Sequence, residues 1–322
     1  MTGLRIGLVS NALSLGNRHA LPDLPSAGPC GTRLLHRAVE GLQGMPEALD
    51  DFAAGEVHVI AVNGGDGTVS AVLTELLSHD RFERLPMLAL LRGGTLNMCA
   101  GDAGLAGTAA RALARLMRQT DADALAAAAT RRHVIRVQRD GDPRAVCGMF
   151  LGLGSLYRAI RYSYDEVPGR QSIPRLHAAR TLGSLIGRHL LRGGAADRIL
   201  RGERVGVAFD DGQETELDLL LAMVTTLDRL VLGFRPYWGQ QDGGLRCTLL
   251  RDPADRLVRR AFRILDGGPE RRLPSDSYCS RNAARLRIGP GLPFAMDGEF
   301  YETDPTAWVT LSAAGPLRFV RC

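Results

Sequence analysis

The sequence predicts two domains, an α/β domain at the N-terminus followed by a mainly antiparallel β domain. The chain has 322 residues, which corresponds to about two domains. In its first part, apolar β-branched runs alternate with glycine turns and helix-period segments, as in a parallel sheet. Further along, short alternating runs separated by Gly and Pro replace that pattern. We place the domains at residues 1–130 and 131–315, with residues 316–322 as a strand that could return to the first domain.

The elements of the first domain follow the period of the apolar residues. Runs that end in polar or glycine turns predict strands, and apolar residues spaced three or four apart predict helices. The alanine-rich residues 121–130 continue the last helix or form a linker. The predicted strands are residues 5–9, 32–39, 57–62 and 86–91, and the predicted helices are residues 45–52, 69–77 and 108–119.

The second domain opens with a predicted hairpin. Alternation from Val134 leads through an Asp-Gly-Asp-Pro turn at residues 140–143 into an apolar run at residues 145–151. Helical segments are expected at residues 156–164 and 173–191. The second of these is basic and amphipathic, which suits either a lipid surface or a solvated helix face. Further strands are expected at residues 204–209, 216–226, 246–250, 286–288 and 308–311.

Composition narrows the classes of protein and partner. With 40 Lys and Arg against 35 Asp and Glu, the net charge of +5 suits anionic nucleotides or membrane surfaces and falls short of a nucleic-acid-binding signature. The six cysteines show no paired spacing for zinc or a redox dithiol, which favours a cytoplasmic location. No apolar stretch reaches the roughly 18–20 residues of a spanning helix, so we expect any membrane contact to be peripheral.

The most informative stretch is Gly-Gly-Asp-Gly-Thr at residues 64–68, between the third predicted strand and a helix. Glycines let the backbone approach a phosphate closely, and the N–H groups of a new helix form an anion site. The stretch therefore predicts a phosphate cradle with Asp66 inside it. The alternative is an ordinary turn in which Asp66 and Thr68 cap the helix.

A second glycine turn, Arg-Gly-Gly-Thr-Leu-Asn at residues 92–97, follows the next predicted strand. Because parallel strands end at the same edge of a sheet, the two turns should lie side by side and share one ligand. Thr95 and Asn97 would offer hydrogen bonds to phosphate or ribose oxygens, or else cap the following helix. The polar loop that begins at Asn11 ends the first strand and could face the same cradle.

Two acidic turns occur in the second domain. Asp297 and Glu299 flank a glycine, and Asp242 precedes Gly-Gly just before a strand. Taken alone, both are hairpin turns. Phosphoryl transfer, however, requires a held phosphoryl group and a carboxylate that accepts a hydroxyl proton, and glycine turns with separate carboxylates supply these parts. The sequence assembles no Ser-His-Asp triad, and its seven histidines form no metal-ligand cluster.

Four motifs together resemble the diacylglycerol kinase catalytic-domain family, which includes bacterial diacylglycerol and phosphatidylglycerol kinases and the sphingosine and ceramide kinases. They are Gly-Gly-Asp-Gly-Thr at 64–68, Gly-Gly-Thr-Leu-Asn at 93–97, Phe-Leu-Gly-Leu-Gly at 150–154 and Asp-Gly-Glu at 297–299. The resemblance extends from about Arg5 to the C-terminus. The first motif is shared with NAD kinases and 6-phosphofructokinases, whereas the set of four is far more specific.

The resemblance implies an NAD kinase/diacylglycerol kinase-like nucleotide domain, a C-terminal β-sandwich that takes the lipid substrate, and ATP with Mg²⁺ as cofactors. It makes Glu299 the proton acceptor, with Asp297 beside it and Asp66 as a third catalytic carboxylate. A structural Mg²⁺ would bind Asp242, helped by the carbonyls of Gly239 and Gly244. The residues that would hold the nucleotide phosphates and their Mg²⁺ are Asn11, Gly64, Gly65, Asp66, Gly67, Thr68, Gly94, Thr95 and Asn97.

The chain also departs from the family pattern. No proline follows Asn11, a nucleotide-contacting Thr is missing near Glu40, Met98 replaces an acidic residue, and an Asp is absent around Val134. We expect an ATP-dependent lipid kinase of phospholipid metabolism that phosphorylates diacylglycerol or a related lipid and is cytoplasmic and peripherally membrane-associated. The alternatives are an NAD-kinase-like enzyme and a non-catalytic nucleotide- or lipid-binding protein. A homodimer is left open.

Overall fold

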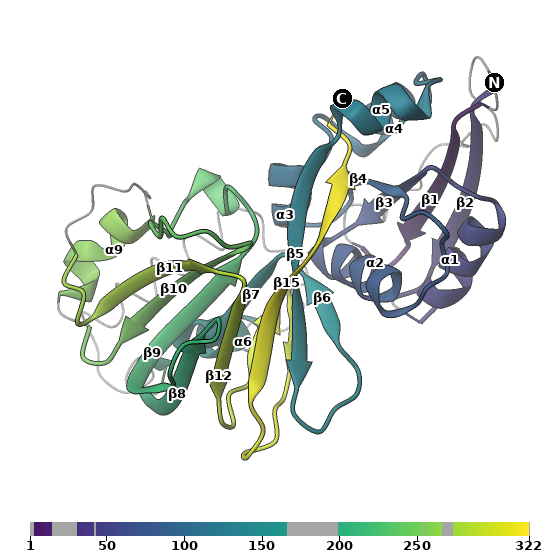
Figure 1. Ribbon diagram of the computed structural model, residues 1–322. Helices are drawn as coiled ribbons and strands as arrows, with labels where there is room; N and C mark the ends of the chain where they lie inside the picture. The colour runs from purple at the N-terminus through teal and green to yellow at the C-terminus, as the bar shows by residue number, and fades with distance from the viewer. Residues whose placement is uncertain are drawn as a thin grey trace. The chain divides into compact units, whose positions relative to one another are not determined.

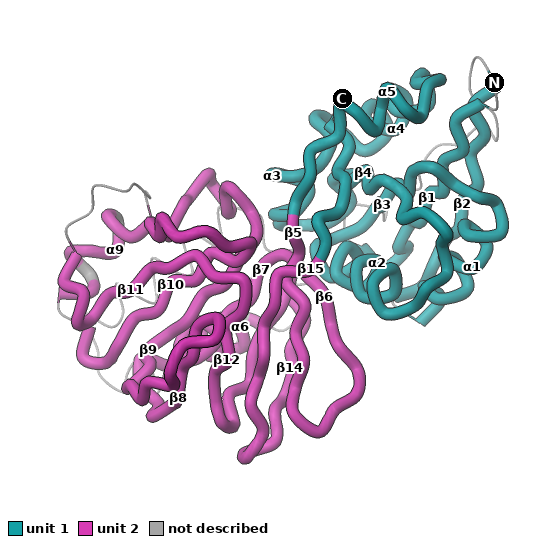
Figure 2. The backbone as a smooth tube through the Cα atoms, in the orientation of Figure 1, with its two compact units in different colours: residues 1–132, 315–322 teal, residues 133–314 magenta. Residues whose placement is uncertain are grey.

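The computed structural model describes residues 3–14, 31–41, 43–165, 199–254, 256–265 and 273–321. The chain divides into two compact units (Figure 2). Unit 1 contains Met1–Arg132 and Gly315–Cys322, and unit 2 contains His133–Ala314. The basic helix predicted at residues 173–191 lies outside the described residues.

Unit 1 is built on a parallel sheet, as the apolar runs predict (Figure 1). Its order is β2–β1–β3–β4, and the end of β15 lies beside β4. Every residue of β3 is buried, and so are the first five of β4, because helices cover both faces of the sheet. The bounds are β1 Arg5–Asn11, β2 Arg33–Val39, β3 Val59–Gly64 and β4 Met87–Arg92.

Five helices of unit 1 are described: α1 Met45–Ala54, α2 Asp66–Ser78, α3 Met98–Ala103, α4 Ala109–Leu116 and α5 Ala122–Ala128. The prediction at residues 108–119 is too long, since Thr108 is the N-cap of α4 and accepts a hydrogen bond from the Arg111 N–H. Asp121 likewise accepts from the N–H groups of Asp123 and Ala124. The alanine-rich stretch is therefore a separate, capped helix.

The two faces of the unit 1 sheet pack against different helices. On one face, strand residues such as Ile6 and Ala61 form a core with Leu113 of α4 and Leu125 of α5. Elsewhere on the sheet, β1 lies directly against α1, where a Cβ added to Gly7 would come within 2.7 Å of the ring of Phe52. This layering leaves the C-terminal ends of β1, β3 and β4 to carry the loops described below.

Unit 2 is mainly antiparallel. The predicted hairpin is confirmed, because β5 pairs with β6. The helices and 3₁₀ turn described in this unit are α6 Ser155–Asp165, α9 Leu257–Leu265 and η3 Val231–Gly233. The strands are β5 Thr130–Arg139, β6 Val146–Gly148, β7 Phe150–Gly154, β8 Glu203–Phe209, β9 Thr215–Thr225, β10 Leu245–Arg251, β11 Tyr278–Ala283, β12 Arg285–Gly289, β13 Phe294–Met296, β14 Glu299–Tyr301 and β15 Val309–Phe319.

Strand β9 is the branch point of unit 2. Its first half pairs with β8, and its second half pairs with β7 along the same edge, while β10 runs along the opposite edge. Apolar residues from these strands and from β5, β12, β13 and β15 form one buried core. The predicted mainly antiparallel second domain is thus confirmed.

Strand β15 belongs to both units. Its first residues pair with β12 in unit 2, and Phe319 pairs in parallel with Leu88 of β4 in unit 1. The sequence predicts two short strands here, at 308–311 and 316–322, whereas the structure has one strand of 11 residues. The small residues between the two apolar runs interrupt the hydrophobic pattern, but the strand continues through them, with a positive φ of 92° at Gly315.

Among the described residues, no helix combines the length and the apolarity needed to cross a bilayer.

We predict that Phe319→Ala destabilises unit 1 by about 3–5 kcal/mol, because it removes a fully buried ring from the core next to β4. Arg318→Ala is the matched control, since the neighbouring side chain is exposed and should change stability by less than about 0.5 kcal/mol. Thermal or urea unfolding of both variants checks this. Equal destabilisation of the two would contradict the role given to this strand.

Candidate functional site

The first glycine turn is very short. Strand β3 ends at Gly64 and α2 begins at Asp66, so Gly65 alone forms the connection, in an extended conformation. A Cβ added to Gly64 would lie 2.5 Å from the Thr68 hydroxyl oxygen. Only glycine therefore allows the first turn of α2 to fold back over the end of the strand.

The two glycine turns lie side by side, as predicted. Strands β3 and β4 pair so that Gly64 lies opposite Arg92. A Cβ added to Gly94 would lie 2.3 Å from the Cα of Gly65. The backbones of the two turns are thus in direct contact, because glycine has no side chain to hold them apart.

The carboxylate of Asp66 connects the two turns. It accepts hydrogen bonds from the backbone N–H groups of Met98, at 3.0 Å, and Cys99, at 2.8 Å. Both groups belong to the first turn of α3, so Asp66 caps the helix after the second glycine turn and its orientation is fixed. The sequence predicts Asp66 either inside a phosphate cradle or as a cap of its own helix. Neither alternative includes a cap on the next helix along the chain.

Asn97 closes the second glycine turn. Its backbone is left-handed, with φ 48°. Its Oδ1 accepts from the Gly94 N–H at 2.7 Å, and its Nδ2 donates to the Gly94 carbonyl at 2.5 Å. The side chain therefore shapes the turn. Thr95, within the turn, is half-buried, and its hydroxyl has no hydrogen-bond partner in the part of the chain that the structure describes.

The loop after β1 faces the first glycine turn, as predicted. Asn11 Nδ2 donates to the Thr68 hydroxyl at 3.0 Å, and Asn11 Oδ1 accepts from the Leu13 N–H at 3.0 Å. Ser14 is a site residue that sequence reasoning missed, since its hydroxyl accepts from the Gly65 N–H at 3.2 Å. The available signal was a small polar residue in a loop at a strand end. Asn11 thus holds the loop against α2, and Ser14 reaches the turn itself.

A polar row crosses the sheet next to the turns. The Ser10 hydroxyl on β1 accepts from Asn63 Nδ2 on β3 at 3.4 Å and lies 3.1 Å from His36 Nε2 on β2. Burial, with a smaller contribution from the nearby Arg37 charge, lowers the pKa of His36 below its ordinary value. We expect His36 to be neutral at physiological pH, so this row adds polarity without adding charge.

In unit 2, Asp297 is 4% exposed and, like Asp66, holds another segment through backbone hydrogen bonds, so we call it the Asp297 brace. Its carboxylate accepts from the N–H groups of Met149, at 2.8 Å, and Phe150, at 3.1 Å. A Cβ added to Gly148 would lie 2.3 Å from Asp297 Oδ2, so the strand approaches the carboxylate closely. Asp297 and Gly298 both have positive φ, 50° and 94°, and form the hairpin turn between β13 and β14.

Glu299, in contrast, is exposed at the start of β14. The next residue, Phe300, makes edge-to-face contacts with Tyr157, at 5.7 Å between ring centroids, and Tyr164, at 5.4 Å. Both tyrosines lie on α6. The strand that carries Glu299 is therefore fixed at one end by the Asp297 brace and along its length by a helix.

The predicted metal-binding residues lie in the loop before β10. Asp242 is exposed, the Gly239 carbonyl accepts from Asn282 Nδ2 at 3.1 Å, and Gly244 packs against His133. Among the described residues, no cluster of three or more His, Cys, Asp or Glu side chains could hold a metal. One carboxylate and two carbonyls, of which that of Gly239 is already bonded, make a small donor set for Mg²⁺. The metal role of these residues stays a prediction.

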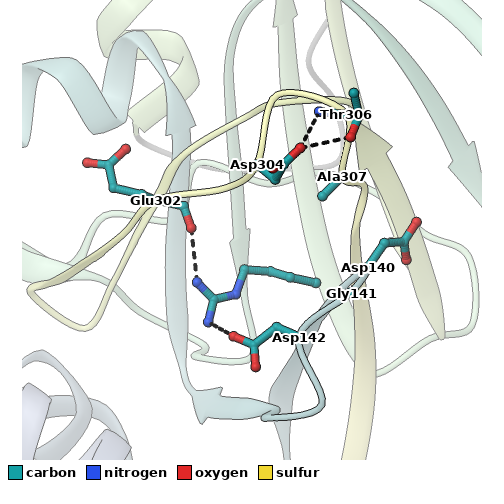
Figure 3. A pocket seen from close by; sticks show the side chains of 8 residues that line it. Asp140, Gly141, Asp142, Glu302, Asp304, Thr306 and Ala307 are labelled. Atoms are coloured by element: carbon teal, nitrogen blue, oxygen red, sulfur yellow. Dashed lines mark hydrogen bonds and ion pairs between the residues drawn. The ribbon is translucent and has the colours of Figure 1, made fainter.

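A cavity of about 550 Å³ lies at the tip of the β5–β6 hairpin (Figure 3). Asp142 and Asp304 are bonded within their own loops, whereas Asp140 pairs with Arg287 and Glu302 with Arg161. The Arg144 N–H, with smaller contributions from the Arg144 and Arg139 side chains, lowers the pKa of Asp142, and the Thr306 N–H and hydroxyl lower that of Asp304. The cavity contains none of the predicted site residues. The lining residues are Arg139, Asp140, Gly141, Asp142, Glu302, Asp304, Thr306 and Ala307.

We predict that Gly94→Ala separates the two glycine turns, because the added methyl group would overlap the Gly65 backbone. Stability should fall by about 1–3 kcal/mol, and nucleotide binding measured by calorimetry should weaken sharply. Gly101→Ala in α3 is the control, since a Cβ there meets nothing within 4 Å and helical alanine is favoured by about 0.5–1 kcal/mol. If Gly94→Ala bound nucleotide like wild type, the contact would have no role in binding.

We predict an alkaline transition from Tyr301, which stacks on Phe294 beside the acidic turn. Burial, aided by the charges of Glu299 and Asp297, raises the pKa of Tyr301 to about 12. The folded state thus keeps a proton that the unfolded state releases at about pH 10, so this stabilisation is full below pH ~10 and is lost as the pH rises toward 12. Urea unfolding from pH 9 to 11.5 should show the loss, and Tyr301→Phe should remove that part of it; identical pH dependence in both proteins would refute the assignment.

The glycine turns lie in a part of the chain that is similar to a known catalytic domain. Residues 29–128 match the sequence model of the diacylglycerol kinase catalytic domain, a span that contains both glycine turns. No curated protein sequence matches the chain.

Two solved structures share the fold. A diacylglycerol kinase from Bacillus anthracis str. Sterne has 17% identity and a TM-score of 0.61, and the alignment covers 99% of this chain and 97% of that one. A second structure from the same organism has 17% identity and a TM-score of 0.64, with 100% and 98% covered. The predicted fold, an α/β domain followed by an antiparallel β domain, is thus confirmed. With the domain match and this shared fold, the resemblance of the chain to the diacylglycerol kinase catalytic-domain family is confirmed.

Proposed function

We propose that the protein is an ATP-dependent lipid kinase that transfers the γ-phosphoryl group of ATP to a hydroxyl of diacylglycerol or a related lipid. The observation that carries this proposal is the direct contact of the two glycine turns, at Gly65 and Gly94, within the span that matches the diacylglycerol kinase domain. Two such turns at the ends of neighbouring parallel strands form a place where a phosphate chain can approach backbone from both sides.

Unit 1 would bind the nucleotide. The first N–H groups of a helix lack acceptors within it, and the helix dipole favours negative charge at this end. In α2 the Thr68 N–H already donates to the Gly65 carbonyl, at 3.0 Å, so the earlier N–H groups are the ones suited to a phosphate. The hydroxyls of Thr68 and Thr95 add neutral hydrogen-bonding groups, and Asn11 fixes Thr68. These residues suit phosphate oxygens.

Asp66 is the residue of unit 1 best suited to hold Mg²⁺ with the phosphates. Mg²⁺ commonly takes one or two protein carboxylates and completes its shell with water and phosphate oxygens. A carboxylate has about four acceptor positions, and the two N–H groups of α3 fix its direction without occupying all of them. When bound, the ion would neutralise charge on the phosphates.

Unit 2 would supply the proton acceptor, Glu299. The lipid hydroxyl oxygen forms a bond to the γ-phosphorus while the bond from that phosphorus to the bridging oxygen of ADP breaks. The hydroxyl proton passes to the Glu299 carboxylate. We assign this role to Glu299 and a positioning role to Asp297, because Glu299 is exposed whereas Asp297 is buried and bonded to two backbone N–H groups.

The test is transfer of radiolabelled phosphate from ATP, with Mg²⁺, to a mixed lipid extract in detergent micelles, with NAD as a separate acceptor. A labelled lipid formed by wild type supports the proposal, and its chromatographic identity gives the lipid class. Labelled NADP in its place would support an NAD-kinase-like enzyme. Nucleotide binding without any labelled product would support a non-catalytic protein.

We predict that Glu299→Gln lowers the transfer rate by about 10²–10⁴-fold with an unchanged unfolding temperature, because an exposed general base is lost without a packing change. Asp297→Asn should lower both the rate and the unfolding temperature, since the amide has one acceptor oxygen and leaves one of the two backbone N–H groups without an acceptor. Transfer assays and thermal unfolding of the two variants are the measurements. A stable Asp297→Asn variant with full activity would exclude the positioning role.

A further inference from the structure

A protruding apolar loop connects β9 to β10. Residues 230–234, Leu-Val-Leu-Gly-Phe, lie between two exposed arginines, Arg229 and Arg235. Leu232 at its tip is 54% exposed and has a left-handed backbone, with φ 60°. An exposed leucine by itself is common on protein surfaces, so the significance of Leu232 depends on the residues around it.

The 230–234 loop is held in shape by its own hydrogen bonds. The Leu230 N–H donates to the Phe234 carbonyl at 2.8 Å, and the Gly233 N–H donates to the Leu230 carbonyl at 3.0 Å. At its base, the Arg246 guanidinium donates to the Leu227 carbonyl, at 2.8 Å, and to the Asp228 carboxylate, at 2.6 Å. A loop fixed in advance loses little conformational entropy when its tip is buried by a partner.

Helix α9 adds a row of positive charge to this surface. Its Ile264 packs in an apolar cluster with Tyr278, whereas Arg259 and Arg263, four residues apart on the helix, are exposed. The two features are joined, because the Arg235 N–H donates to the carbonyl of Leu265, the last residue of α9, at 2.9 Å. We call the 230–234 loop, its two flanking arginines and the exposed arginines of α9 the loop–α9 surface.

The charge of the loop–α9 surface is not neutralised within the described part of the chain. No carboxylate there forms an ion pair with Arg229, Arg235, Arg259 or Arg263. Arginines elsewhere in unit 2 do have partners, such as Arg204 with Glu216 at 2.7 Å. An apolar tip among exposed arginines is complementary to a surface that is anionic outside and apolar beneath.

We propose that the loop–α9 surface docks on an anionic lipid bilayer, with Leu232 inserted among the lipids and the arginines against their phosphates. The proposal rests on the proposed function for the choice of a membrane as the partner. The proposal gains support from hydrogen bonds that connect the base of the 230–234 loop to the acidic turn at Asp297. The Thr226 N–H, at the base of the loop, donates to the Met149 carbonyl at 3.1 Å, and the Met149 N–H donates to Asp297.

The test is flotation of the full chain with vesicles of phosphatidylcholine alone or mixed with phosphatidylglycerol. Wild type should bind the anionic vesicles at least tenfold more strongly, and added salt should weaken this binding. Leu232→Asn removes the apolar tip but keeps a residue that tolerates a left-handed backbone. We expect it, and the double variant Arg259→Glu/Arg263→Glu, each to lower binding about tenfold.

Matched control variants are available in unit 1. Leu85→Asn replaces a leucine that is 52% exposed, and Arg111→Glu/Arg118→Glu reverses two exposed arginines. Both controls should bind vesicles nearly as wild type does. The proposal is overturned if the controls lose as much binding as the loop–α9 variants, or if those variants bind like wild type. It is also overturned if Leu232→Asn instead dissolves a dimer seen by sedimentation, which would make this surface a contact between two copies.

A second readout separates docking from catalysis. On a short-chain diacylglycerol below its micelle concentration, the loop–α9 variants should transfer phosphate at the wild-type rate. Retained rate with lost vesicle binding supports docking. Vesicle binding by wild type without any transfer would refute the kinase proposal and leave the docking proposal standing.

Discussion

The close approach of Gly65 to Gly94 is the constraint on which the geometry of unit 1 depends. The pairing of β3 with β4 brings two turns to the same sheet edge, and a single methyl group between them would force them apart. Asp66 then fixes the distance by capping α3 from the first turn of α2. Strand pairing thus brings the two turns together, the glycines allow them to touch, and the cap on α3 and the proposed phosphate site both depend on that contact.

Unit 2 uses the same device in a different setting. Asp66 and Asp297 each direct a carboxylate at two consecutive backbone N–H groups of another segment, Met98 and Cys99 in one case and Met149 and Phe150 in the other. Each carboxylate belongs to a motif whose residue types suggest chemistry, yet its first task is structural. A charged acceptor shared by two amides is strong and directional, which suits a turn that must present a neighbouring group.

Much of the fold could be predicted from sequence, because it depends on local period. Buried parallel strands and the β5–β6 hairpin follow from apolar runs and turn residues. The partners of Asp66 and Asp297 could not be predicted, since they lie 32 and 148 residues away in the chain. The helix division at Asp121 and the role of Ser14 were likewise missed, because each depends on a specific hydrogen bond that composition does not reveal.

The path of β15 has a consequence for how the protein is made. Leu317, Phe319 and Val320 are buried in unit 1, although the whole of unit 2 separates them in the chain from the first 132 residues. A ribosome releases the first 132 residues long before these three, so the edge of β4 that pairs with Phe319 stays uncovered until residues 317–320 have been made. Domains usually fold as they emerge, N-terminal first. Here the first unit to emerge is completed last, and the exposed strand edge is the surface a chaperone would have to protect in the meantime.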